Sequence, residues 1–173
     1  SPRPIENYLT DDINGINWIK IGDVSKDSNV INATKEKIKP EGKNKSRFVT
    51  KGDLLLSNSM SFGRPYILNV DGCIHDGWLV IRNYKKAFNT NFLCYILDSD
   101  LAKSQYKKLA AGGVVINLNK ELVASTKFFV PCLEEQEKIA KVLSKMDELI
   151  EEKKALLSDW QQLKKGLLQQ MFV

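Results

Sequence analysis

The sequence predicts an α+β protein in which a small, mixed, mostly β domain is followed by one long C-terminal helix. Before Pro131, short apolar runs alternate with turn signals, which is typical of short strands. After Pro131, one helical pattern continues without proline and without glycine until Gly166. We therefore expect a domain over residues 1–132 and a helix over residues 133–173.

The first part of the domain contains apolar segments bounded by turn residues, and we predict that each is extended. These segments are Trp18–Val24, Gly52–Ser57 (a turn and then a buried strand), Arg64–Val70 and Cys73–Arg82. The polar, lysine-rich residues 26–47 contain Pro40 and Gly42 and are predicted to form a loop.

Helical spacing of apolar residues returns at residues 91–109, which predicts one or two helices. A break is expected at residues 98–100, where serine and aspartate can cap a helix. The pair Gly112-Gly113 ends this helical region, and Thr126–Pro131 is predicted to be a last strand.

The C-terminal helix has an apolar stripe with gaps of three, four and seven residues, which is heptad spacing. Its members are Ile139, Val142, Met146, Leu149, Leu156, Trp160, Leu163 and Leu167. A helix of about 38 residues is roughly 57 Å long, too long for its own domain to cover. We expect this stripe to form an antiparallel coiled coil with a second copy or with another subunit. A core helix of a larger bundle is the alternative, but the sequence predicts no second long helix.

The excess positive charge lies in the first part of the chain. Residues 134–173 hold eight acidic residues and seven lysines, which is a net charge of −1. Because the whole chain has a net charge of +5, residues 1–133 carry a net charge of +6. A basic domain indicates a polyanionic partner, most commonly nucleic acid, although a charge of this size can also serve solubility alone.

Cysteine and histidine usage argues against a metal site. The three cysteines form no CxxC pair, and His75 is the single histidine. No apolar run reaches the ~20 residues of a membrane helix, and no secretion signal is found, so we expect a cytoplasmic protein. We find no nucleophile–histidine–carboxylate set and no P-loop, and we expect no catalytic residue, metal ligand or cofactor in this chain.

Several polar segments suit contact with nucleic acid. Residues 35–51 hold seven basic residues against two acids, which favours phosphate contacts, although a solvated surface loop has the same composition. Asn58 and Arg64 offer an amide and a guanidinium that can read base edges, while asparagine and serine also form ordinary turns. The Gly112-Gly113 turn could approach a backbone closely.

The segment VPCLEEQEKIAKVLSKMDELI, which starts at Val130, closely resembles the conserved region of specificity subunits of type I restriction–modification enzymes. Upstream matches follow in the family's order: INWIKIGDV at residues 16–24, GDLLLS at residues 52–57, Gly63-Arg64, and Ala111-Gly112-Gly113 with Asn117-Leu118. Arg64 stands where lysine is common, which keeps the positive charge. The second glycine, Gly113, stands where threonine or serine is more usual.

The resemblance implies a non-catalytic subunit whose target-recognition domain reads one half of a bipartite DNA sequence. The helix would act as a spacer and dock methyltransferase subunits, which carry S-adenosylmethionine and methylate adenine, and a translocating restriction subunit would join them. Family subunits have two recognition domains and two such helices, whereas this sequence has one of each. It could be a trimmed chain or a natural half-subunit that forms a homodimer or pairs with a second specificity half.

The resemblance also places His75, Asp76 and Trp78 on the DNA-facing side, although Trp78 could equally belong to the core. With the residues above, the expected DNA-binding set is Lys20, Lys43, Lys45, Arg47, Lys51, Ser57, Asn58, Ser59, Ser61, Arg64, His75, Asp76, Trp78, Gly113, Asn117 and Lys120. Two other functions stay open at this point: a scaffold that binds protein or RNA and dimerises through its helix, and an enzyme domain in which His75 and Asp76 form a catalytic pair.

Overall fold

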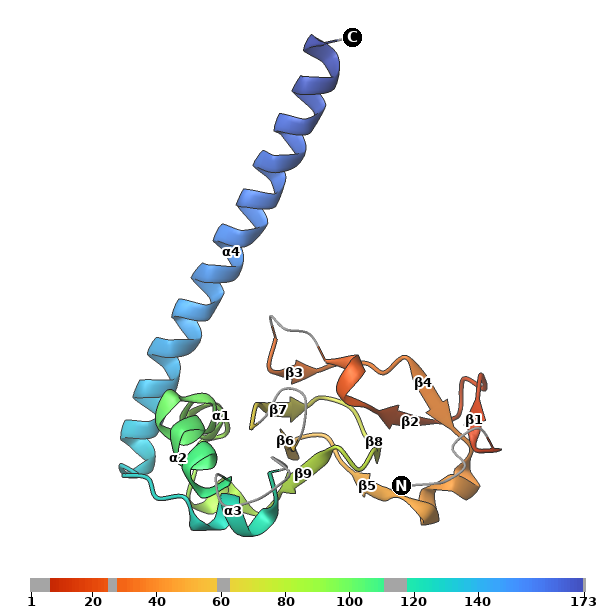
Figure 1. Ribbon diagram of the computed structural model, residues 1–173, viewed down its shortest axis with the longest axis vertical. Helices are drawn as coiled ribbons and strands as arrows, with labels where there is room; N and C mark the ends of the chain where they lie inside the picture. The colour runs from red at the N-terminus through yellow and green to blue at the C-terminus, as the bar shows by residue number, and fades with distance from the viewer. Residues whose placement is uncertain (1–6, 25–27, 59–62, 111–117, 173) are drawn as a thin grey trace. The chain divides into compact units, whose positions relative to one another are not determined.

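The computed structural model describes residues 7–24, 28–58, 63–110 and 118–172 (Figure 1). The chain divides into two compact units, Ser1–Val130 and Pro131–Val173. Within the described ranges, no helix is both long enough and apolar enough to cross a bilayer.

The described residues of the first unit form two small sheets. One has the strand order β1-β4-β2-β8-β5, with β1 Leu9–Thr10, β4 Glu36–Ile38, β2 Ile16–Ile19, β8 Gly72–Ile74 and β5 Arg47–Val49. The other has the order β3-β7-β6-β9, with β3 Val30–Ile31, β7 Pro65–Leu68, β6 Leu54–Ser57 and β9 Trp78–Ile81. The pairs β2–β8 and β3–β7 are parallel, and the other pairs are antiparallel.

Strand β6 separates two apolar cores. Leu54 and Leu56 point into a cluster with helix residues such as Leu93 and Tyr106. Leu55, between them, packs into a second cluster that includes Trp78. Alternate side chains of a strand point to opposite faces, so the fully apolar run LLL is explained by burial on both faces. The predicted buried strand at this position is confirmed.

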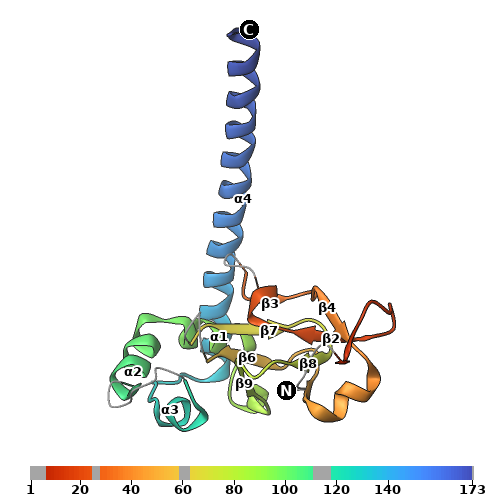
Figure 2. The ribbon, with the colours of Figure 1, turned by 45° about the vertical axis from the view of Figure 1, so that its right-hand side comes forward.

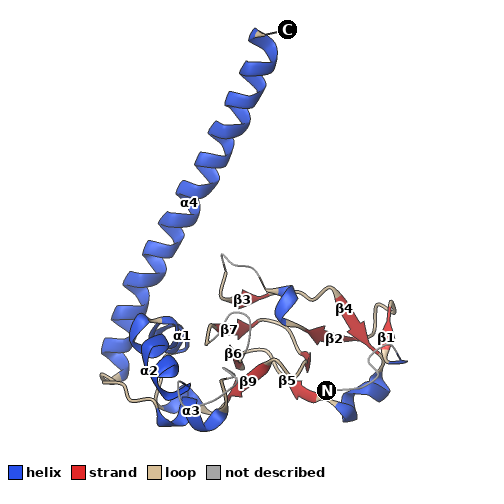
Figure 3. Cartoon of the chain, viewed as in Figure 1, coloured by secondary structure: helices blue, strands red, loops and turns tan. Residues whose placement is uncertain are grey.

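In the described part of this unit, three helices follow the strands and gather at one end, away from β4 (Figures 2 and 3). They are α1 Thr90–Asp98, α2 Asp100–Ala110 and α3 Lys120–Ser125. The Asn89 side chain caps α1 by accepting from the N–H groups of Asn91 and Phe92. The Ser99 hydroxyl accepts from the N–H of Ala102 at 3.2 Å, which separates α1 from α2 at the predicted break.

The predicted strand Trp18–Val24 is shorter in the structure. It ends at Ile19 and is followed by a 3-10 turn at Ile21–Asp23. The Asp23 carboxylate accepts the Lys20 N–H at 2.9 Å and so turns the chain.

The predicted loop at residues 26–47 was wrong, because its described part contains β3, β4 and a 3-10 helix at Pro40–Lys45. Strands β3 and β4 are each anchored to the core by one buried residue, Ile31 and Ile38. A polar segment with so few apolar residues gives little periodic signal.

The predicted strand Thr126–Pro131 does not form. The Gln105 side chain binds both backbone groups of Lys127, at 2.9 Å each, in place of a partner strand. Phe128 packs against the helix-side core, but Phe129 is exposed. The β-branched and aromatic residues of this segment therefore predicted a strand that does not form. Backbone groups whose hydrogen bonds are satisfied by a side chain need no neighbouring strand.

The second unit contains the predicted long helix, α4, at Leu133–Met171. Glu134 and Glu135 lie in its first turn, where the helix dipole favours negative charge. Except for Ile139, the predicted stripe residues are 46–61% exposed: Val142, Met146, Leu149, Leu156, Trp160, Leu163 and Leu167. The fold class is confirmed, while pairing of this stripe in a coiled coil stays a prediction.

Candidate nucleic-acid interface

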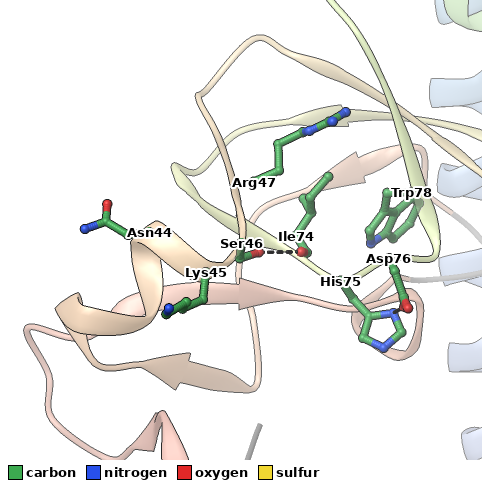
Figure 4. A pocket seen from close by; sticks show the side chains of 8 residues that line it. All are labelled: Asn44, Lys45, Ser46, Arg47, Ile74, His75, Asp76 and Trp78. Atoms are coloured by element: carbon green, nitrogen blue, oxygen red, sulfur yellow. Dashed lines mark hydrogen bonds and ion pairs between the residues drawn. The ribbon is translucent and has the colours of Figure 1, made fainter. Parts of the chain in front are cut away.

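The β5–β8 ladder brings two distant polar segments together. In its register Arg47 lies opposite Ile74, and the Ser46 hydroxyl donates to the Ile74 carbonyl at 2.8 Å. A surface hollow of about 540 Å³ lies between the segments (Figure 4). It is lined by Asn44, Lys45, Ser46, Arg47, Ile74, His75, Asp76 and Trp78.

The rim and the floor of this hollow differ in character. Asn44, Lys45, Arg47 and Asp76 are exposed, whereas Ile74 and Trp78 are buried. Figure 4 shows Lys45 and Arg47 on either side of Ser46, with His75 and Asp76 beyond Ile74. Exposed polar groups thus surround a buried apolar floor.

His75 and Asp76 form a close pair on the rim. The Nδ1 atom of His75 lies 2.7 Å from Asp76 Oδ1 and 3.2 Å from the Gly77 nitrogen. This ring nitrogen can donate to the carboxylate or accept from the Gly77 N–H. The His75 ring also packs against Trp18 in a T-shaped arrangement, with 6.2 Å between the ring centroids. The Asp76 carboxylate thus lies beside the imidazole ring of His75 on the rim.

Two members of the expected set are interior residues, and this corrects their assignment as surface contacts. Trp78 is 4% exposed, donates its indole N–H to the Ile19 carbonyl at 3.2 Å and packs edge-on against Tyr66. Ser57 is fully buried, and its hydroxyl accepts the Arg64 N–H at 3.1 Å. Trp78 forms part of the floor of the hollow, and Ser57 lies opposite Trp78 in the β6–β9 ladder.

Asn58 lies beside the hollow. Its side-chain amide donates to the Asp76 carbonyl at 3.0 Å, and its N–H donates to the Gly77 carbonyl at 3.0 Å. Its own carbonyl accepts the Leu118 N–H at 3.1 Å. Asn58 therefore ties the β6 end to the residues before β9 and to the segment that leads into α3.

Arg64 is held in place by its neighbours. Its Nε and Nη2 atoms donate to the Asn29 side-chain oxygen at 3.2 and 3.0 Å. Its guanidinium also lies over the Tyr66 ring, 5.4 Å from the centroid. Much of the donor capacity of Arg64 is already used within the unit.

The predicted lysines fall in different places. Lys20 pairs with Glu36, and Lys43 lies over the Phe48 ring at 4.1 Å. Lys51 lies in the turn after β5, at the other end of that strand from the hollow, so the structure does not bring it to this site. Lys120 is the first residue of α3, two residues after Leu118.

Four predicted site residues, Ser59, Ser61, Gly113 and Asn117, lie outside the described residues. Sequence reasoning missed Asn44 and Ser46, which line the hollow. Asn44 stands between two of the predicted lysines, and an amide within a basic run was a signal that could have identified it.

Lys43 also influences a buried residue of β8, Cys73. Burial raises the pKa of the Cys73 thiol, and the positive charge of Lys43 partly opposes that rise. Cys73 therefore stays a protonated core residue at neutral pH. Among the described residues, no three histidine, cysteine or acidic side chains gather as metal ligands would.

Comparison with known proteins identifies the relatives of this chain. Residues 2–158 match the family model described as type I restriction modification DNA specificity domain. Two curated relatives come from Methanocaldococcus jannaschii. The type I restriction enzyme MjaVIII specificity subunit is 28% identical over 75% of this chain, and the putative MjaX specificity subunit is 32% identical over 67%. The chain spans only 30% and 27% of the lengths of these two proteins.

Two solved structures share the fold. The HsdS subunit from Thermoanaerobacter tengcongensis has a TM-score of 0.71 and 21% identity, over 98% of this chain and 44% of that one. A chain from a structure on complex assembly and conformational transition of the type I R-M system has a TM-score of 0.66 and 20% identity, over 96% and 39%.

Proposed function

The chain belongs to the family of type I restriction modification DNA specificity domains, and we propose that it reads one half of a bipartite sequence in duplex DNA. In this proposal the chain is a non-catalytic subunit. It selects the DNA site, and other subunits, in the cytoplasm, perform the chemistry.

The observation that carries the proposal is the meeting of residues 44–47 with residues 74–78 at one edge of the first unit. Lys45 and Arg47 in the hollow, and Lys43 just before it in the chain, supply positive charge for phosphates. Asn44 and Asp76 add an amide and a carboxylate, which phosphates do not require but base edges can use. A surface that combines both kinds of group suits a polyanion whose sequence is read.

The exposed stripe of α4 supports the second half of the proposal. Its side chains would pack against the helix of a second copy or of another specificity half, and the paired helices would set the distance between two recognition units. The same helices would dock the methyltransferase subunits, on which we expect S-adenosylmethionine, and the restriction subunit.

The test is binding of the full chain to fluorescent duplex DNA at several salt concentrations. Contacts with about four phosphates give a slope of about −3 to −4 for the logarithm of the binding constant against that of salt. We expect the double substitution Lys43→Gln and Lys45→Gln to reduce this slope by about 2.

The matched control is the double substitution Lys85→Gln and Lys86→Gln, in the exposed 3-10 turn after β9. It removes the same charge at the end of β9 away from the hollow and should leave the slope unchanged. Equal slopes for all three proteins, or tighter binding to single-stranded RNA than to duplex DNA, would reject the proposed function.

A further inference from the structure

The turn between β8 and β9 carries two residues of the rim and connects the two sheets, since β8 belongs to one sheet and β9 to the other. The N–H of His75, at the start of this turn, donates to the Ile19 carbonyl at 3.1 Å. A Cβ atom on Gly77 would come within 2.7 Å of the Ile21 side chain. The turn therefore packs closely on the segment that follows β2.

Asn58 holds the same turn from the side of β6, which ends at the preceding residue. Its N–H donates to the Gly77 carbonyl at 3.0 Å, and its side-chain amide donates to the Asp76 carbonyl at 3.0 Å. These two bonds engage the carbonyl groups of two consecutive residues of the turn. Because the Asn58 carbonyl accepts the Leu118 N–H at 3.1 Å, the same residue also fixes the segment that leads into α3.

These bonds do not suit the predicted role of Asn58 as a reader of base edges. Bidentate binding of adenine uses both the oxygen and the nitrogen of an amide, whereas the nitrogen of this amide faces a carbonyl group of its own chain. Among the described residues, those that line the hollow do not include Asn58. Asn58 instead contacts the backbone of a residue that does line it, Asp76.

We propose that Asn58 is a positioning residue for DNA readout, which holds His75 and Asp76 on the rim in the arrangement that meets the duplex. This inference rests on the proposed function. Without the side-chain amide, the Asp76 carbonyl loses this donor and the turn can take other conformations. Hydrogen bonds to base edges require a fixed geometry, whereas attraction between charges and phosphates tolerates displacement. Loss of the amide should therefore reduce sequence preference more than overall attraction to DNA.

The experiment is selection of bound sequences from a randomised duplex library by the full chain, followed by sequencing. Asn58→Ala should lower the preference for the wild-type motif by about 2- to 10-fold, since one hydrogen bond of ordinary strength is lost. The loss should extend over several neighbouring positions, and His75→Ala should affect the same positions. The dependence of binding on salt should stay as in the wild type, because Asn58→Ala removes no charge.

The matched control is Asn17→Ala. The Asn17 side-chain amide also donates to a backbone carbonyl, that of Asp71 at 2.8 Å, but at the end of β8 away from the hollow. This variant should enrich the wild-type motif. A second variant at the site, Asn58→Asp, keeps the size of the side chain but cannot donate when ionised, and it should reduce preference at the same positions as Asn58→Ala. Urea unfolding checks that each variant is folded.

The possible results separate the inference from the proposed function. If Asn58→Ala alters preference at a single position, Asn58 reads a base itself and the inference is wrong. It is also wrong if Asn58→Ala and His75→Ala alter different positions. If both Asn58 variants are folded and enrich the wild-type motif, the bonds of Asn58 serve stability alone, while the proposed function stands. If the wild-type chain enriches no motif, the proposed function itself is rejected.

Discussion

Tyr106 links the helix-side core to the turn at Gly63, just before β7. The residue is fully buried in α2, and its ring lies where a Cβ atom on Gly63 would come within 2.7 Å. Gly63 has a φ of 74° and donates its N–H to the Ser57 carbonyl at 2.9 Å. Only glycine fits this turn, both for its backbone angle and for the space that Tyr106 leaves.

Burial of Tyr106 predicts a loss of stability at alkaline pH. Burial raises the pKa of this phenol from 10.0 to about 12, so the unfolded chain loses its proton first as the pH rises. Between these two values the free energy of unfolding should fall by about 1.4 kcal/mol per pH unit on account of this group. Below pH 10 the contribution is fully present.

Urea unfolding at several pH values from 8 to 12 measures this effect. In Tyr106→Phe, the decrease in the free energy of unfolding that this phenol causes should be absent. Tyr8→Phe, which changes a half-buried tyrosine, should keep that decrease. If the free energy of unfolding fell equally with pH in the wild type and in Tyr106→Phe, burial would not hold the phenol neutral.

At the site, individual residue types were predictable from sequence but their roles were not. Arg64 looked like a base reader because its neighbours are polar, yet Asn29, 35 residues earlier, engages it. His75 and Asp76 were expected on the site, but their position opposite residues 44–47 depends on the β5–β8 register. One sequence gives no information on such long-range pairings.

Among the elements, α4 was the most predictable because its signal is periodic over many turns. Short strands such as β3 and β4 have two or three residues each, too few to display a period. The helices α1 and α2 were predicted together with their break, since local capping by Asn89 and Ser99 depends on neighbours in sequence.

The exposed stripe of α4 leads to a prediction about assembly. Leu156→Asp places a charge in the apolar seam and should weaken self-association of the chain by at least about tenfold, since burial of an unpaired charge costs several kcal/mol. Sedimentation equilibrium measures the dissociation constant. Ser158→Asp, which adds the same side chain outside the heptad stripe, is the control. Equal dissociation constants for the two variants would contradict pairing through this stripe.

In the whole molecule, charge and apolar surface are divided between the two units. The basic excess belongs to residues 1–133, and the exposed apolar stripe belongs to α4. We infer that the first unit recognises DNA and the second recognises protein. This division implies that the first unit determines sequence preference independently of the subunits that α4 would dock.

The most direct test of this account is a graft of residues 1–130 into one recognition position of a complete type I methyltransferase whose target is known. Sequencing of methylated adenines then gives the new target. The account predicts that one half of the target changes to a new sequence, while the other half stays as it was. Methylation that continues at the original target, with the graft folded in place, would contradict the claim that this unit reads DNA sequence.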